Sequence, residues 1–144
     1  MATDLEKLLA FCVEHKLLDT ESAKRAACEY DRYWESIVRI VVKCGVDERK
    51  LYEIAAGIHH IRLVELDQLT VDPNVLDFVP LEHANQLYCI PYSINTSDLS
   101  VVTCHWDRLE VITKGMANLT GKQIHVDLIS DSDYSRLNER LTEQ

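Results

Sequence analysis

The stretch LYCIPYSINTSDLSVVTCH, residues 87–105, predicts a β-hairpin and decides the fold class of the second half of the chain. Two runs rich in β-branched, aromatic and other apolar residues, LYCIPYSI and LSVVTCH, flank the polar turn Asn-Thr-Ser-Asp at residues 95–98. Such runs on either side of a polar turn are typical of paired antiparallel strands. The hairpin therefore predicts a small sheet in this half of the chain.

Helical and strand-like patterns follow one another on both sides of the hairpin. The glycine at position 121 has the placement of a helix C-terminal residue in the left-handed conformation. Together the patterns predict an α/β subdomain over residues 61–144 with three or four strands. Its expected further elements are a strand in IRLVEL (61–66), short helices opened by Pro73 and Pro80, a helix over 106–119, a strand in QIHVDLI (123–129) and a helix over 132–141.

The first sixty residues have the apolar spacing of helices. Two segments, KLLAFCVEHKLLDTESAKRAACEY from Lys7 and ESIVRIVVKCGVDERKLYEIAAGI from Glu35, form a weak repeat offset by 28 residues. In each segment an apolar helix leads through a short turn to a second helix, capped by Asp19 or Thr20 in the first copy and by Asp47 in the second. We therefore predict an α+β fold, in which two helix-turn-helix units over residues 1–60 pack on the α/β subdomain.

Composition excludes several classes of function. A formal net charge of -9 with scattered Lys and Arg disfavours binding to nucleic acid or to an anionic membrane surface. No apolar run approaches the roughly 20 residues that span a bilayer, and the N-terminus lacks a signal-peptide pattern, so we expect a cytoplasmic protein without direct membrane insertion. Five cysteines without a CxxC pair are expected to be small core residues, and no histidine spacing suggests a metal or another cofactor.

The segment KGMANLTGKQIHVDL, residues 114–128, superficially resembles a nucleotide-binding P-loop. Five residues separate its glycines where a P-loop has four, and Gln123 stands where Ser or Thr would hold Mg²⁺. The expected order, helix and then strand, is also the reverse of a P-loop. Because a nucleophile-elbow sequence is absent as well, we expect no enzymatic activity.

Residues 71–141 resemble the N-terminal domain of the type II secretion ATPase and of related type IV pilus assembly ATPases. The family has a proline before a helix, an alanine within it and a strand with a central proline, which Val79-Pro80, Ala84 and Ile90-Pro91 match. The closing order of strand, Asp and helix also matches, from Val126 onward. One departure is His105-Trp106-Asp107, which stands where the family has Asp-Pro at the start of a helix.

The resemblance extends to a 24-residue family motif of the form RLGxxLVxxGLIxxxxLxxALxxQ, which fits from Lys7 to Tyr30 and more loosely from Glu35. In some members this tandem motif binds cyclic di-GMP, which would place the ligand at Lys7, Leu8, Leu9 and Lys16 here. Lys7 replaces the Arg, while Leu9 and Lys16 replace the two glycines. Side chains at glycine positions prevent close approach of the backbone to a ligand, so we expect Leu9 and Ile37 to close such a site.

The resemblance implies a domain without chemistry of its own, which ties a cytosolic secretion or pilus ATPase to the cytoplasmic part of an inner-membrane platform protein. The alternatives are a regulatory domain that binds cyclic di-GMP and a helical and α/β module unrelated to secretion. Aromatic and arginine residues anchor protein interfaces most often, and local packing is the competing explanation for each. The candidate interface residues are Arg32, Trp34, His105 and Trp106.

Overall fold

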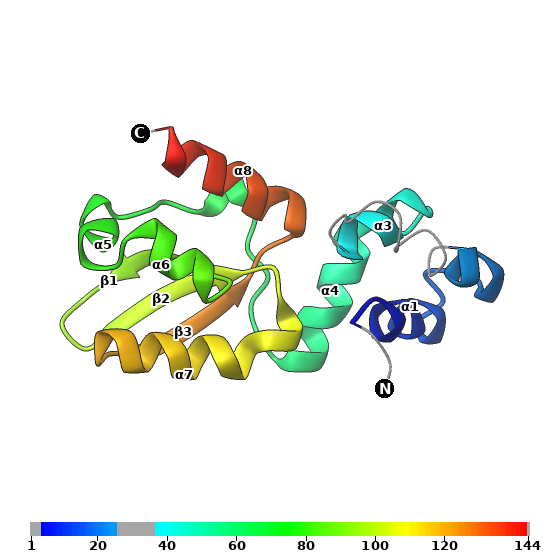
Figure 1. Ribbon diagram of the computed structural model, residues 1–144, viewed down its shortest axis with the longest axis horizontal. Helices are drawn as coiled ribbons and strands as arrows, with labels where there is room; N and C mark the ends of the chain where they lie inside the picture. Colours follow the sequence, from blue (N-terminus) through cyan, green and yellow to red (C-terminus); the bar gives the residue numbers. More distant parts are fainter. Residues whose placement is uncertain (1–3, 26–36, 144) are drawn as a thin grey trace. The chain divides into compact units, whose positions relative to one another are not determined.

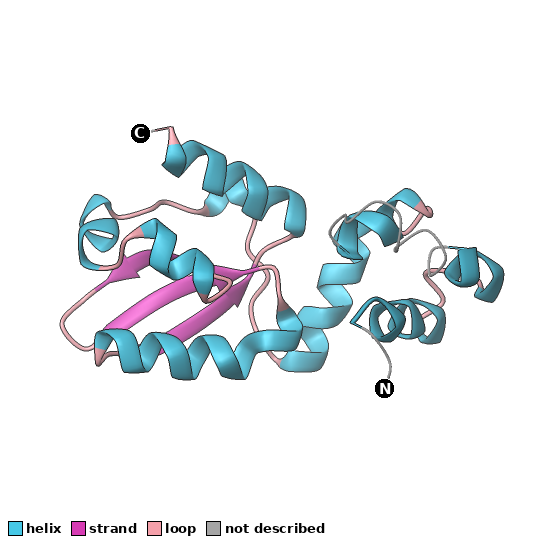
Figure 2. Ribbon diagram, in the orientation of Figure 1, coloured by secondary structure: helices cyan, strands magenta, loops and turns pink. Residues whose placement is uncertain are grey.

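The computed structural model describes residues 4–25 and 37–143, which divide into two compact units, Met1–Leu51 and Tyr52–Gln144. The boundary falls inside helix α4. The first unit is helical, and the second combines helices with a sheet, so the predicted α+β class is confirmed (Figures 1 and 2). Every described helix is too short or too polar to cross a bilayer.

The helical unit contains α1 (Asp4–Glu14), a helical segment over residues 20–25, α3 (Ile37–Lys43) and the first turn of α4 (Glu48–His59). α1 packs against α3. Asp19 caps the segment that follows it, because its Oδ1 accepts a hydrogen bond from Ser22 N at 2.7 Å. Asp47 caps α4 in the same way, accepting from Arg49 N at 3.0 Å and Lys50 N at 3.3 Å. Both predicted caps are confirmed.

The two repeat copies end their first helices with the same left-handed turn. In the first copy Leu17 N donates to Cys12 O at 2.8 Å and Lys16 has a φ of 60°. In the second, Val46 N donates to Val41 O at 3.3 Å and Gly45 has a φ of 102°. The helix ends are thus 29 residues apart, whereas the caps are 28 apart, because the second turn is one residue shorter.

Lys16 occupies a backbone conformation that a glycine adopts without steric cost. We therefore expect Lys16→Gly to raise the free energy of unfolding by about 1 kcal/mol, since the Cβ clash of the left-handed region is removed. Thermal and urea unfolding measure the change. Lys16→Ala is the matched control because it keeps the Cβ, and it should leave stability nearly unchanged; a Gly variant less stable than the Ala variant would contradict this account.

The α/β unit is built on a three-stranded sheet in the order β1-β2-β3. β1 (Ile90–Ile94) and β2 (Asp98–Thr103) form the predicted antiparallel hairpin, with a bulge between Pro91 and Ser93. β2 continues through α7 (Leu109–Thr120) to β3 (Gln123–Leu128), which runs parallel to it. Gly121 ends α7 with a φ of 71°, as its placement predicted.

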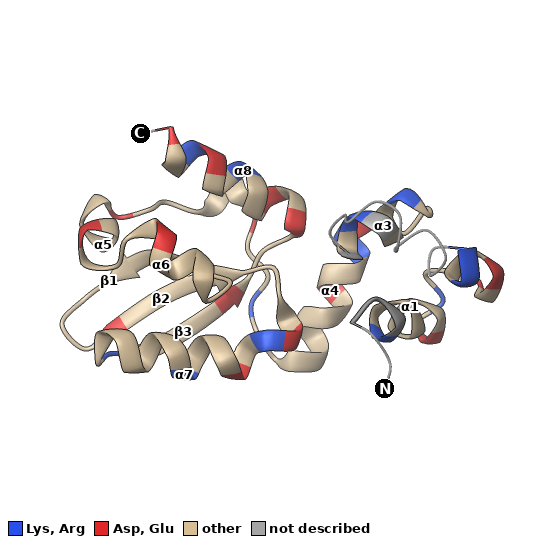
Figure 3. Cartoon of the chain, viewed as in Figure 1, with Lys and Arg blue, Asp and Glu red and all other residues tan. Residues whose placement is uncertain are grey.

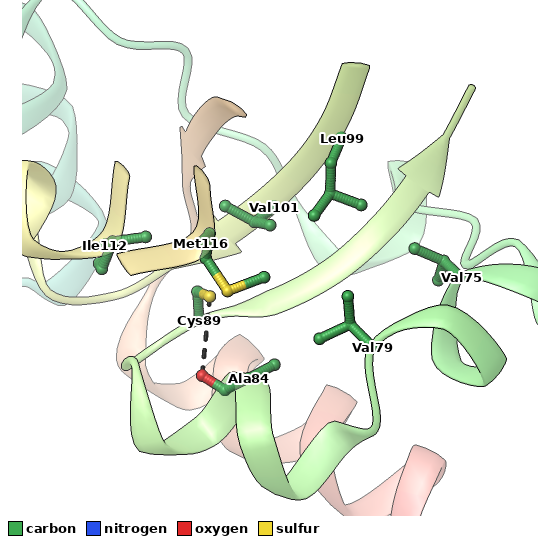
Figure 4. Close-up of a cluster of buried hydrophobic side chains, with 8 residues drawn as sticks. All are labelled: Val75, Val79, Ala84, Cys89, Leu99, Val101, Ile112 and Met116. Atoms are coloured by element: carbon green, nitrogen blue, oxygen red, sulfur yellow. Dashed lines mark hydrogen bonds between the residues drawn. The ribbon is translucent and has the colours of Figure 1, made fainter. Parts of the chain in front are cut away.

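Helices cover both faces of this sheet. Leu99 and Val101 of β2 face a core completed by α5 (Pro73–Phe78), α6 (Leu81–Gln86) and α7, shown in Figure 4. Val102 points to the opposite face, where α8 (Asp131–Thr142) and the 3-10 helix Leu66–Gln68 complete a second core. A further 3-10 turn, Trp106–Arg108, leads into α7. The helices expected after Pro73 and Pro80 are confirmed as α5 and α6. Those expected over residues 106–119 and 132–141 are confirmed as α7 and α8.

Two expectations are wrong. Residues 61–66 form no strand: Leu63 makes a single parallel bridge to Leu128, and the chain then turns into a 3-10 helix at Leu66. The spacing of Leu51, Ile54, Ala55 and Ile58 predicts one buried stripe on α4, yet Ile58 is 48% exposed, whereas Tyr52 is fully buried. The apolar spacing of α4 identifies the helix but not which of its faces is covered.

Candidate functional site

The start of α7 carries a group of aromatic and basic side chains, which we call the aromatic cluster. Three of its ring pairs have edge-on geometry: Tyr52 with Trp106 at 5.1 Å between centroids, Tyr88 with His105 at 5.2 Å, and His105 with Tyr134 at 6.5 Å. The Cζ of Arg108 lies 4.4 Å from the centre of the Tyr88 ring, within reach of a cation–π interaction. The cluster consists of Tyr52, Tyr88, His105, Trp106, Arg108 and Tyr134.

Hydrogen bonds from the end of β2 hold this cluster in place. Thr103 Oγ1 donates to Tyr88 O at 2.6 Å and accepts from His105 N at 3.0 Å. Tyr52 Oη donates to Cys104 O at 3.1 Å, so a residue of α4 is anchored to the same strand end. Tyr88 itself has a φ of 62°, at the left-handed end of α6. These bonds fix the backbone from which Trp106 projects.

The electrostatics of the cluster favour neutral groups. Burial lowers the pKa of His105, with Asp107 and Asp131 acting in the opposite direction and Arg108 in the same one. Burial likewise raises the pKa of the Tyr134 hydroxyl, which donates to Asn85 Oδ1 at 2.8 Å. A neutral imidazole packed between two tyrosine rings has the environment of a packing residue more than of an acid or base. No group of three or more metal-ligating side chains occurs in residues 4–25 and 37–143.

The structure brings two of the predicted interface residues together. His105 and Trp106 lie side by side in the aromatic cluster, and both are half-buried. Arg32 and Trp34 lie outside the described residues. The candidate nucleotide positions fall on α1 and its C-terminal turn, where Lys7 and Lys16 are exposed while Leu8 and Leu9 are buried.

Tyr88 and Arg108 are members of the cluster that sequence reasoning missed. Tyr88 lies within the run LYCIPYSI, whose β-like composition hides the left-handed residue that ends α6 before the strand begins. Arg108 is one polar residue at the head of a helix, with no pattern to single it out.

Two exposed apolar side chains extend along α7 from this site. Val111 and Leu119 are each 51% exposed. Between them, Gly115 lies against Leu87: a Cβ at this position would come within 2.9 Å of Leu87 Cδ2. Aromatic, arginine and exposed apolar side chains are residue types that occur at protein-docking surfaces.

A polar network joins Asp127 of β3 to Arg62 and Tyr92. Asp127 Oδ2 accepts from Arg62 Nη2 at 2.8 Å and from Tyr92 Oη at 2.5 Å. Arg62 and Tyr92 also line a shallow depression of about 400 Å³ together with Gln68 and Ser93. The shared carboxylate joins the segment after α4 to β1 and β3, although its ion pair with Arg62 adds little stability because Arg62 is 68% exposed.

The described cysteines have different surroundings, which predicts different reactivity. Burial raises the pKa of Cys12 to about 11 and that of Cys89 to about 12, and it also raises that of Cys104. At pH 8 these three buried thiols should react with iodoacetamide far more slowly than the half-buried Cys44. Peptide mapping by mass spectrometry measures the rates; modification of Cys89 as fast as Cys44 in the folded chain would contradict the packing described here.

Comparison with known proteins settles the family. The model of the MshEN domain matches residues 59–144, more than half of the sequence. The chain belongs to the MshEN domain family. This confirms the resemblance to the N-terminal domain of the type II secretion and type IV pilus ATPases. A search of curated protein sequences found no match.

Solved structures share the fold of this MshEN domain over nearly its whole length. MshE, solved with cyclic di-GMP, has a TM-score of 0.68 at 14% identity, with 96% of this chain and 99% of that chain covered. The N-terminal domain of XpsE has a TM-score of 0.64 at 17% identity, with 97% of each chain covered. A second crystal form of XpsE gives 0.56 at 19% identity. At these identities the likeness shows the fold alone.

Proposed function

We propose that this MshEN domain is a cytoplasmic docking domain of a bacterial secretion or pilus assembly system. In this proposal it binds the cytoplasmic part of an inner-membrane platform protein, or another secretion component, and so brings a cytosolic ATPase to the membrane. Family membership supports the secretion context. Its peripheral place at the membrane would come from the partner, since no described helix could cross a bilayer.

The aromatic cluster is the observation that carries the proposal. Tyr88, Trp106 and Arg108 are half-buried, so each keeps part of its surface for a partner while its base is held by the fold. Tyr, Trp and Arg are the residues that contribute most binding energy at protein interfaces. Because hydrogen bonds hold the aromatic cluster in place, it loses little side-chain entropy on binding, which favours affinity. The proposal is tested by titrating the chain with the cytoplasmic domain of its platform protein.

We propose further that the domain performs no catalysis of its own. The family places it at the N-terminus of ATPases, outside their catalytic part. Its titratable groups support this view, because the carboxylates with resolved partners are explained by structure: Asp98 pairs with His125 at 3.0 Å, and Asp127 with Arg62. The pKa of Asp98 is lowered by its hydrogen bonds to His125 and Ser97, so it remains ionised as a structural partner.

A second candidate function is regulation by cyclic di-GMP. It is favoured by the fold shared with MshE, whose structure contains this ligand. The residues at the corresponding motif positions argue against it here. Leu9, at the first glycine position, is a buried side chain of α1, and Lys16 adds an exposed side chain at the second. The 29-residue offset between the ends of the two first helices makes Val38, which is also buried, the counterpart of Leu9 in place of the expected Ile37.

We expect neither cyclic di-GMP nor ATP to change the melting temperature of the chain by more than about 1 °C. A ligand that binds only the folded state stabilises it by about 2.7 kcal/mol at roughly a hundred times its Kd, which would shift the melting point by several degrees. Differential scanning fluorimetry with each nucleotide measures the shift. A shift with cyclic di-GMP alone would establish the regulatory function in place of the docking function.

A further inference from the structure

We propose that the outer edge of β3 binds an extended, basic segment of a partner protein, which adds a fourth strand to the sheet. The inference rests on the proposed docking function and assigns that function a second contact surface. A partner strand at a sheet edge gains affinity from main-chain hydrogen bonds and selectivity from alternate side chains.

The hydrogen bonds of β3 alternate between β2 and the outer side. Gln123 N donates to Ser97 O at 2.9 Å and Ile129 N donates to Thr103 O at 2.9 Å, so the odd-numbered residues face β2. Leu128 faces outward: its N–H donates to Arg62 O at 2.8 Å, and its carbonyl accepts from Val64 N at 2.8 Å. Because strands have a period of two, the N–H and C=O groups of Ile124 and Val126 also face outward.

The outward groups of Ile124 and Val126 have no hydrogen-bond partner among the described residues. Continuing the parallel pairing back from the Leu63–Leu128 bridge would place Ile61 beside Val126 and His59 beside Ile124. Those residues cannot extend along β3, because α4 runs to His59 and the chain turns at His60 with a φ of 55°. The end of α4 therefore stops the fourth strand after one bridge and leaves the edge open.

The open edge lacks three features that often protect such strands. Proteins block exposed edges with lysine, proline or a bulge. Residues 123–128 contain no lysine and no proline, and their pairing with β2 is regular. Ile124 and Val126 are half-buried against the core beneath α7, whereas Gln123 and His125 are exposed on the other side. An incoming strand with apolar residues at alternate positions would continue both the core and the polar face.

The charge of the unit indicates a basic occupant and disfavours a second copy. Residues 52–144 contain 14 Asp and Glu against 6 Lys and Arg, which gives a formal charge of −8 out of the chain's -9. Acidic residues are distributed over the sheet and its helices (Figure 3). Two such units repel each other, while complementary charge speeds association and selects a partner. A segment with lysine or arginine between its apolar residues fits this surface.

The first test uses an eight-residue peptide of alternating lysine and valine, capped at both ends, and NMR hydrogen exchange on the full chain. We expect the amides of Ile124 and Val126 to exchange at least tenfold more slowly when the peptide is bound. The amides of Gln123 and Asp127 should not change, because they already face β2. No added protection at Ile124 and Val126, or equal binding of a glutamate–valine peptide, would overturn the proposal.

Val126→Pro tests the edge by a substitution in this chain. It removes an outward N–H without removing a bond to β2, so the sheet should keep its pairing. We expect it to raise the Kd of the lysine–valine peptide at least tenfold. Val126→Ile keeps the N–H and should change that Kd by less than about twofold. Equal binding by the proline variant would overturn the proposal. So would a wild-type dimer in sedimentation that the proline variant loses, because the occupant would then be a second copy. Should the proline variant fail to fold, the wild-type exchange pattern decides.

Titration with the platform domain separates this inference from the docking function. If the wild type binds that domain and Val126→Pro binds it equally well, the edge is not the contact while the docking function stands. If the wild type does not bind it but the peptide protects Ile124 and Val126, the docking function fails while the edge site stands. Weakened binding of the platform domain by Val126→Pro, with Val126→Ile unchanged, supports both.

Discussion

Ile112→Ala is expected to lower the free energy of unfolding of the α/β unit by about 3 kcal/mol. Ile112 is 0% exposed and packs in the core that α7 shares with β2 and α5. Removing three carbons from a fully buried aliphatic side chain loses the transfer free energy and leaves a cavity, because neighbours such as Met116 relax only in part. Urea unfolding measures the loss.

Val111→Ala provides the matched control for this prediction. Val111 is the adjacent residue of the same helix, yet it is 51% exposed, so its truncation should change stability by less than about 0.5 kcal/mol. The two variants differ in burial and scarcely in chemistry. Similar losses at both positions would contradict the packing of α7 against the sheet described here.

Trp106→Ala is expected to weaken binding of the platform domain by about thirtyfold, or about 2 kcal/mol. The indole is half-buried, packs edge-on against Tyr52, and stands beside Arg108 and Tyr88 in the aromatic cluster. A truncation here removes a large, rigid side chain from the proposed contact surface. Titration calorimetry or biolayer interferometry measures the change in Kd.

Two controls separate a contact from a packing role at Trp106. Trp106→Phe keeps a ring against Tyr52, so it should retain the fold and lose less affinity than the alanine variant. Glu139→Ala, an exposed substitution on α8, should leave affinity unchanged. If Trp106→Ala remains folded and still binds the platform domain as tightly as the wild type, the aromatic cluster is not the docking site.

Local rules predicted most of the elements because each had its own signature. The hairpin around residues 95–98, the aspartate caps at Asp19 and Asp47 and the left-handed Gly121 depend on residues near in sequence, and the structure contains all of them. The strand expected over residues 61–66 does not form, although its composition suits a strand. The segment lies between the end of α4 at His59 and the 3-10 helix that begins at Leu66, and it makes a single bridge to β3.

The candidate site was predictable only in part. His105 and Trp106 could be singled out because aromatic residues at the turn into a helix belong to the types that anchor interfaces. Tyr88 joins them because its own backbone is left-handed, which composition does not indicate. Tyr52 joins them through its hydrogen bond to Cys104, 52 residues further along the chain. Clusters assembled from distant segments depend on tertiary packing, which a single sequence does not encode in its local spacing.

The measurement that tests the central claim most directly is a calorimetric titration of the wild-type chain with the cytoplasmic domain of the platform protein of its own system. The docking account predicts saturable binding with a defined stoichiometry, in the absence of any nucleotide. Complete absence of binding across the micromolar range, with both proteins folded, would contradict the claim that this MshEN domain is a docking domain.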